Sequence, residues 1–206
     1  MNLIRKLMMC CFTFLITLNS WYIKAELITA EQLVQAAKLR LEAEITYDGR
    51  YLSIDYPMGD VPEHLGVCTD VVIRSYRQLG IDLQQLVHED MRENFEQYPK
   101  IWGLKRPDSN IDHRRVPNLE VFLQRYGKQL PIADSADDYK PGDLVSWRLP
   151  GNLPHIGIVS DEKSDISDNY LIIHNIGAGP KEDDILFEFP ISGHFRFFPE
   201  LKVSSQ

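Results

Sequence analysis

The hydrophobic positions of the chain follow a helical spacing near its start. Leu33, Ala37, Leu41 and Ile45 recur every fourth residue, which places them on one face of a helix. Just before them, Thr29-Ala30-Glu31-Gln32 matches a capping box. We therefore predict a helix that begins near residue 30.

Further helices follow before the pattern changes. The run from Cys68 to about Leu79 predicts a helix that Gly80 ends in the usual C-terminal position. Two more are predicted at residues 82–95 and from Asn118 to Tyr126. Residues 51–56 alternate as a strand does, and residues 98–117 are irregular.

From Pro141 onward the pattern alternates with the period of two that strands show. The strand-like runs are 144–147, 155–159, 171–174 and 195–198. Helices followed by strands predict an α+β fold, with N-terminal helices packed on a small antiparallel β-sheet. Since no linker divides residues 26–206, we expect a single domain.

The first 25 residues have a different character. Arg5 and Lys6 precede an apolar stretch at residues 7–18, and the small residue Ala25 follows, as in a secretory signal peptide. The apolar stretch is shorter than the about 20 residues that span a bilayer. We expect residues 1–25 to be removed and the protein to be exported, to the periplasm, without a stable membrane anchor. A retained anchor is the alternative.

Charge narrows the choice of partners. Residues 1–25 hold three basic and no acidic side chains, so their removal leaves 19 basic and 30 acidic ones, a formal charge of −11. So acidic a chain is a poor ligand for nucleic acid. We expect a monomer that needs no cofactor.

One of the three cysteines, Cys68, lies outside the expected signal peptide. Cys10 and Cys11 lie in the expected signal peptide, which leaves Cys68 as the single cysteine of the mature chain. An unpaired exported thiol is a reactive centre, half of an intermolecular disulfide, or a buried apolar side chain. Its position at a helix start favours reactivity, because the helix N-terminus stabilises a thiolate and lowers the thiol pKa.

Two histidines lie in strand-like runs. If the strands of His155 and His174 pair, both rings can lie on one face of the sheet. Cys68 packed against that sheet would then combine a nucleophile, a general base and a group that orients the base. The same three residues could also bind zinc, although the close ligand spacing of zinc motifs is missing from the sequence.

These residues together resemble the NlpC-type branch of the papain-like cysteine peptidases. The resemblance rests on Cys68 at a helix start, Pro141-Gly142-Asp143-Leu144-Val145, His155-Ile156-Gly157-Ile158-Val159 and Ile172-Ile173-His174. Two further stretches are similar to an exported bacterial family known as domain-of-unknown-function family 1287. They are Asp112-His113-Arg114-Arg115-Val116-Pro117-Asn118 and His174-Asn175-Ile176-Gly177-Ala178-Gly179-Pro180.

The resemblance implies a papain-like (NlpC-type) fold and a role for each matching residue. Cys68 would be the nucleophile, His155 the base and His174 the residue that orients it, with Asn175 as the alternative for that last role. Tyr56 precedes the cysteine at about the spacing of a tyrosine that many members place beside the site.

A second set of residues would bind substrate. Arg114 and Arg115, with His113 beside them, would bind stem-peptide carboxylates; ion pairs with the chain's own acidic residues are the alternative. The sequence departs from the family at the nucleophile, where Asp-Cys-Ser-Gly is common and Val67-Cys68-Thr69-Asp70 stands here.

The implied function is an exported cysteine hydrolase that cleaves an amide bond, in peptidoglycan stem peptides, through an acyl-enzyme. Two alternatives stay open. The altered residues around Cys68 suggest a binding protein on the same scaffold that does not turn over. The same thiol would also serve an acyltransferase or an amidase that acts on another peptide-like substrate.

Overall fold

The computed structural model of the chain describes residues 26–200. The expected signal peptide, residues 1–25, lies outside the described residues, so export stays a prediction. Between residues 26 and 200, none of the helices has both the length and the apolar character needed to cross a membrane.

The helices come first in the chain, as predicted. The expected capping box is present, because the Thr29 hydroxyl accepts from the Gln32 backbone N–H at 3.1 Å and the Gln32 side chain accepts from the Thr29 N–H at 2.8 Å. Gly80 has a φ of 79° and follows the helix that begins at Cys68. The helices are α1 (Ala30–Lys38), α2 (Cys68–Gln78), α3 (Leu83–Asn94) and α4 (Val116–Tyr126), with 3-10 turns η1 (Phe95–Gln97), η2 (Asp112–Arg114) and η3 (Ala136–Asp138).

The strands form a six-stranded antiparallel sheet in the order β3-β8-β4-β5-β6-β7. They are β3 (Lys128–Gln129), β4 (Leu144–Leu149), β5 (Leu153–Lys163), β6 (Tyr170–His174), β7 (Lys181–Asp183) and β8 (Ile191–Arg196). A separate parallel pair, β1 (Thr46–Tyr47) and β2 (Leu65–Gly66), lies just before α2. The α+β prediction is confirmed.

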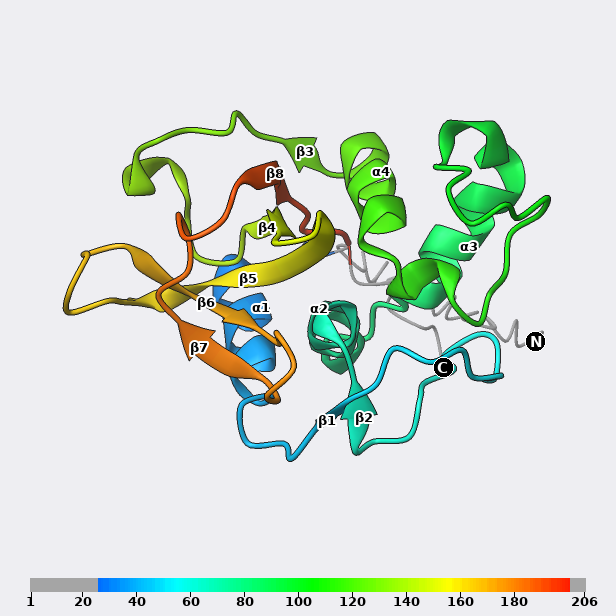
Figure 1. The fold of residues 1–206 in the computed structure, drawn as a ribbon, viewed down its shortest axis with the longest axis horizontal. Coiled ribbons are helices and arrows are strands. Elements are labelled where there is room, and N and C mark those ends of the chain that lie inside the picture. Colours follow the sequence, from blue (N-terminus) through cyan, green and yellow to red (C-terminus); the bar gives the residue numbers. More distant parts are fainter. Residues whose placement is uncertain (1–25, 201–206) are drawn as a thin grey trace, which may run out of the picture.

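Alternation along the central strands divides the core into two clusters. Ile156 and Ile158 of β5 face the helices, whereas Val159 belongs to a second cluster on the other face of the sheet. Figure 1 shows α1 and α2 against one side of the sheet and α3 farther from it, beyond α4. Since α2 contacts α1, α3 and β5, its first turn is fixed relative to the strand that carries His155.

Four predicted elements differ from the structure. The strand expected at residues 195–198 is displaced toward the N-terminus, since β8 spans Ile191–Arg196. The α1 helix ends at Lys38, well before Ile45. Residues 51–56 form no strand, because the Ile54 N–H donates to the Asn110 side chain at 2.9 Å instead of to a neighbouring strand. The α4 helix begins at Val116, so Asn118 lies inside its first turn and donates to the Asp112 carbonyl at 3.0 Å. In the last two cases a distant side chain or carbonyl provides the hydrogen bond that the local pattern cannot show.

Candidate active site

Cys68 is the first residue of α2, as predicted. Val67 precedes it in an extended conformation, with φ −126° and ψ −173°, which is usual at an N-cap. Valine has no polar side chain to cap the helix. Asp70, the third residue of α2, makes the reciprocal contact of a capping box, because its carboxylate accepts from the Val67 N–H at 2.7 Å. Asp70 therefore holds the backbone just before Cys68 in place, although an aspartate at this position departs from the pattern of the family that the sequence resembles.

The Asp70 carboxylate also forms a buried ion pair with Arg114. Two N–H groups of the guanidinium donate to it at 2.9 and 2.8 Å, and the two side chains are 4% and 2% exposed. The Thr69 hydroxyl donates to the Arg114 carbonyl at 3.1 Å. Arg114 therefore joins η2 to the start of α2. This agrees with the ion-pairing alternative, and we assign Arg114 no part in substrate binding.

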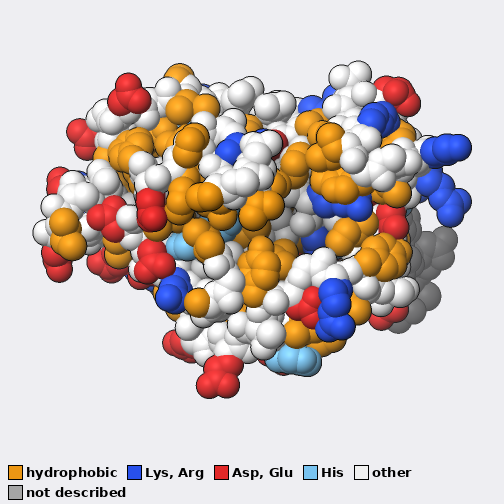
Figure 2. All heavy atoms as spheres, in the orientation of Figure 1, with side chains coloured by type: hydrophobic (Ala, Val, Ile, Leu, Met, Phe, Trp, Pro, Cys, Tyr) orange, Lys and Arg blue, Asp and Glu red, His pale blue; other side chains and the backbone are white. Residues whose placement is uncertain are grey.

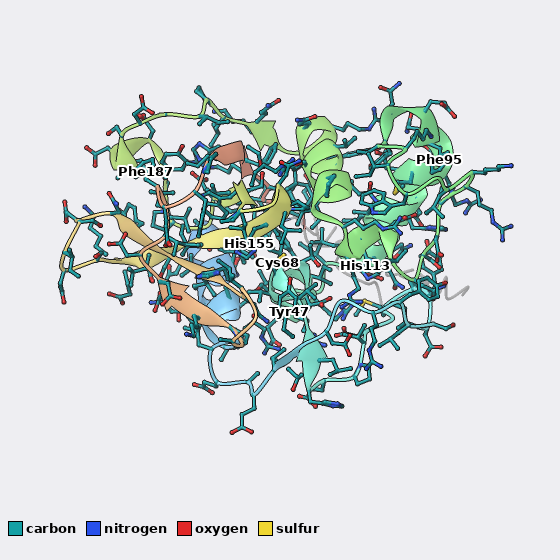
Figure 3. The ribbon with its side chains drawn as sticks, viewed as in Figure 1. Tyr47, Cys68, Phe95, His113, His155 and Phe187 are labelled. Carbon is teal, nitrogen blue, oxygen red and sulfur yellow. The ribbon has the colours of Figure 1, made fainter. Side chains whose placement is uncertain are left out.

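The Cys68 side chain packs against Ile156 of β5, and the Ile156 N–H lies near enough to the sulfur to favour a thiolate. That contact is one residue from His155, and Figure 3 shows the two labelled residues next to each other at the centre of the molecule. Pairing between β5 and β6 begins only at Ile158, so the β5 segment before it has no partner on the β6 side. Among the described side chains, however, the thiol makes no hydrogen bond to His155.

Burial controls the charge of this pair. The Cys68 side chain is 4% exposed, and burial raises its pKa to about 11, although the N–H groups of Ile156, Thr69 and Cys68 itself act in the opposite direction. Burial and the neighbouring His174 lower the pKa of His155 to about 3. At neutral pH both groups are uncharged, which is opposite to the depressed thiol pKa expected from a helix start.

The two histidines lie on one face of the sheet, as predicted. Nε2 of His155 and Nδ1 of His174 are 3.2 Å apart, and the rings meet edge to face. Gly157 lies on β5 two residues after His155, and a Cβ placed on it would come within 3.1 Å of the His174 Cβ. The glycine therefore allows the two imidazoles to approach each other.

Asp183 lies next to His174, at the ring nitrogen that does not face His155. Strand β7 pairs Asp183 with Ile172, which brings an Asp183 carboxylate oxygen to 3.4 Å from His174 Nε2. The contact falls short of a hydrogen bond, and within residues 26–200 the buried Nε2 has no other partner, but the negative charge nearby favours the tautomer of His174 that carries its proton on Nε2. Nδ1 of His174 is then an acceptor for His155, whose remaining ring nitrogen stays available to the thiol. The sequence offered no signal for Asp183, which lies within a run of acidic residues.

A tyrosine lies beside the cysteine, but it is not Tyr56. The Tyr56 ring instead packs against His88, with the ring centroids 4.9 Å apart. Strand β1 pairs Tyr47 with Gly66, two residues before Cys68. Burial, together with Cys68 and Asp70, raises the pKa of Tyr47 to about 12. Tyr47 therefore takes the position predicted for Tyr56, and only the β1–β2 pairing reveals it.

The other predicted residues lie around this centre without joining it. Arg115 lies over the Trp102 ring at 4.1 Å and 3.4 Å from the Asp112 carboxylate. His113 is buried, and burial lowers its pKa to about 3. Asn175 is also buried, and its side-chain oxygen accepts from the Gly177 N–H at 2.9 Å rather than contacting His155. His174 therefore occupies the position for which both it and Asn175 were candidates.

Figure 2 shows hydrophobic side chains spread over the middle of the face drawn and acidic side chains gathered toward the sheet end. Within residues 26–200, no group of three or more His, Cys, Asp or Glu side chains has the arrangement of a metal site. The geometry thus gives no support to the zinc alternative.

Comparison with known proteins adds the following. A family model described as "Domain of unknown function (DUF1287)" matches residues 34–197. The chain is 51% identical to "Uncharacterized protein YijF" of Escherichia coli (strain K12) over 166 residues, which are 81% of this chain and 80% of that protein. The solved structure of NlpC1 from Trichomonas vaginalis aligns with a TM-score of 0.45 and 16% identity, over 85% of this chain and 47% of that one. This chain therefore spans about half the length of that structure's chain.

Proposed function

The chain belongs to the DUF1287 family, and we propose that it is an exported cysteine hydrolase that cleaves an amide bond in peptidoglycan stem peptides. The observation that carries the proposal is the order of groups in the site. The Cys68 sulfur lies beside the β5 segment that holds His155, and His155 is followed by His174 and Asp183. A nucleophile, a base and the groups that orient the base are what acyl transfer requires.

The first half of the reaction forms an acyl-enzyme. The thiol gives its proton to the free ring nitrogen of His155, and the sulfur bonds to the amide carbonyl carbon. Transfer needs the imidazole to close onto the sulfur, as catalytic contacts commonly do when substrate is bound. The backbone N–H groups of Cys68 and Thr69, in the first turn of α2, lie near the sulfur and would bind the oxyanion of the tetrahedral intermediate.

The second half releases the products. The imidazolium of His155 donates its proton to the leaving amine as the C–N bond breaks, which leaves a thioester on Cys68. Water, deprotonated by His155, then attacks the thioester and yields a carboxylic acid and the free thiol. Proton transfer creates a thiolate and an imidazolium side by side, and their attraction offsets the burial that opposes each charge alone.

The test is digestion of purified sacculi. The parent protein should release stem-peptide fragments, while Cys68→Ala and His155→Ala should release none and should retain the melting temperature of a folded protein. His64→Ala is the matched control, since His64 is an exposed histidine of the loop before β2. Fragment release by Cys68→Ala at the parent rate would end the proposal.

A binding protein on the same scaffold is the second candidate. The observation that favours it is the buried, uncharged thiol, which has no hydrogen bond to His155 among the described residues. Alkylation by iodoacetamide separates the two functions. A hydrolase should show a thiol that His155→Ala makes slower to react near neutral pH, whereas in a binding protein the variant should react at the parent rate.

A further inference from the structure

A small cavity lies beside the first turn of α2, outside the group of Cys68, His155 and His174. Its volume is about 30 Å³, enough for one or two waters or one small polar group. It is bounded by the α1–β1 connection, the start of α2 and the loop after β6. Its walls include Arg40, Ile45, Val67, Val71, Asn175 and Pro180.

Two hydrogen-bond donors at this cavity have no acceptor. Asn175 is fully buried, and its side-chain oxygen is engaged by the Gly177 N–H, so the amide orientation is fixed. Its Nδ2 is buried without a partner among the described residues, and so is Nε of Arg40. A buried donor that lacks an acceptor is costly, so each such group needs an explanation.

Of the other charged groups in the walls, two are already engaged and the third faces solvent. Asp70 is bound by Arg114 and the Val67 N–H. Arg74 is bound by Asp60 and by backbone carbonyls. Glu63 is exposed to solvent.

Within residues 26–200, Arg40 has no carboxylate within ion-pair distance. The cavity therefore offers one cationic and one amide donor and needs an acceptor with negative charge. A carboxylate satisfies both donors at once.

The cavity adjoins the proposed catalytic residues. Val67 is the residue before Cys68, and Asn175 follows His174. A group held there would lie close to the reactive sulfur, on the side of α2 toward the β6–β7 loop.

We propose that this cavity, built around Arg40 and Asn175, binds a carboxylate, and that the carboxylate belongs to the peptide that Cys68 attacks. That the cavity binds a carboxylate follows from the cavity and its unpaired donors alone. That this carboxylate belongs to the peptide attacked by Cys68 rests on the proposed function.

Binding is tested first without chemistry. The Arg40 Nε–H and Asn175 side-chain NH₂ signals of the Cys68→Ala protein are followed by NMR during titration with sodium acetate and, separately, with L-alanyl-γ-D-glutamyl-diaminopimelate or its fully amidated form. Sodium chloride controls for ionic strength. The free acid and acetate should shift both signals, and the amidated peptide should not.

Variants then identify the donors. Asn175→Asp keeps the acceptor for Gly177 but replaces the donor with a repelling charge, and Arg40→Gln removes the cation. Each should weaken peptide binding at least about tenfold, the effect of losing one charge-assisted hydrogen bond. Arg92→Gln removes an exposed arginine of α3 and should bind as the parent does.

The outcomes separate the two proposals. If neither acetate nor the acidic peptide shifts the two signals, the cavity holds only water and the inference falls, whatever happens to sacculi. If acetate binds through Arg40 and Asn175 but the acidic and amidated peptides bind equally, the carboxylate is a free one and does not belong to the attacked peptide. If the acidic peptide binds through both residues while sacculi stay uncut by the parent, the site stands and the hydrolase proposal fails.

Discussion

Replacing Asp70 with Asn should destabilise the fold by about 3–5 kcal/mol, because the Arg114 guanidinium would stay buried without its carboxylate. The two side chains are 4% and 2% exposed and share two short hydrogen bonds, of 2.9 and 2.8 Å. Asparagine keeps an oxygen that can still accept from the Val67 N–H. The expected loss is therefore mainly the loss of charge compensation.

The assay is urea-induced unfolding together with the melting temperature. In a domain of this size each kcal/mol shifts the melting temperature by about 2–4 °C, so we expect a decrease of roughly 6–20 °C. Asp60→Asn is the matched control. Its carboxylate binds Arg74 and Arg77 but is 33% exposed, so we expect no more than about 1 kcal/mol.

A double variant completes the test. Asp70→Asn combined with Arg114→Met removes both charges and keeps an acceptor for the Val67 N–H, so stability should return to near that of the parent, because no unpaired charge stays buried. If Asp70→Asn melts within about 1 °C of the parent, the ion pair does not hold the start of α2 and our explanation of Asp70 is refuted.

Changes nearer the sulfur test the site itself. Because burial raises the pKa of Cys68 from 9.0 to about 11, the folded state holds the thiol proton more tightly; the resulting stability is complete below pH 9 and is lost as the pH rises toward 11. Cys68→Ala should flatten that part of a urea-derived stability curve, and an unchanged slope would contradict the shift. Asp183→Asn should move the His174 proton from Nε2 toward Nδ1 in ¹⁵N NMR and reduce kcat roughly tenfold at constant KM, with Asp183→Glu restoring both. Gly157→Ala should cost about 1–3 kcal/mol in thermal unfolding, because its Cβ would lie 2.6 Å from Ile172 Cγ2; a parent-like melt would show that the strands adjust freely.

The elements that could be predicted are those encoded by neighbouring residues. The Thr29 capping box, the helix that begins at Cys68 and the alternation of β4, β5 and β6 all depend on side chains a few positions apart. Residues 51–56 show the limit of such patterns. Their alternation suits a strand, but a strand exists only where another chain segment pairs with it, and the Asn110 side chain binds there instead.

The residues of the candidate site also fall into those that the sequence predicted and those that only the structure revealed. The residue types and order of Cys68, His155 and His174 could be found in the sequence, since a single cysteine outside the expected signal peptide and two histidines in strand patterns are local features. Tyr47 and Asp183 could not, because strand pairing alone brings them to the cysteine and to His174. The role of Arg114 also depended on a partner 44 positions away.

By itself, the sequence predicted one cysteine outside the expected signal peptide, at a helix start, and two histidines able to share one face of a sheet. Only the tertiary structure decided the charge on that thiol. The helix N-terminus favours a thiolate, but packing against β5 removes solvent from the sulfur and raises its pKa to about 11. Desolvation depends on everything that surrounds a group, and no spacing of residues along the chain records it.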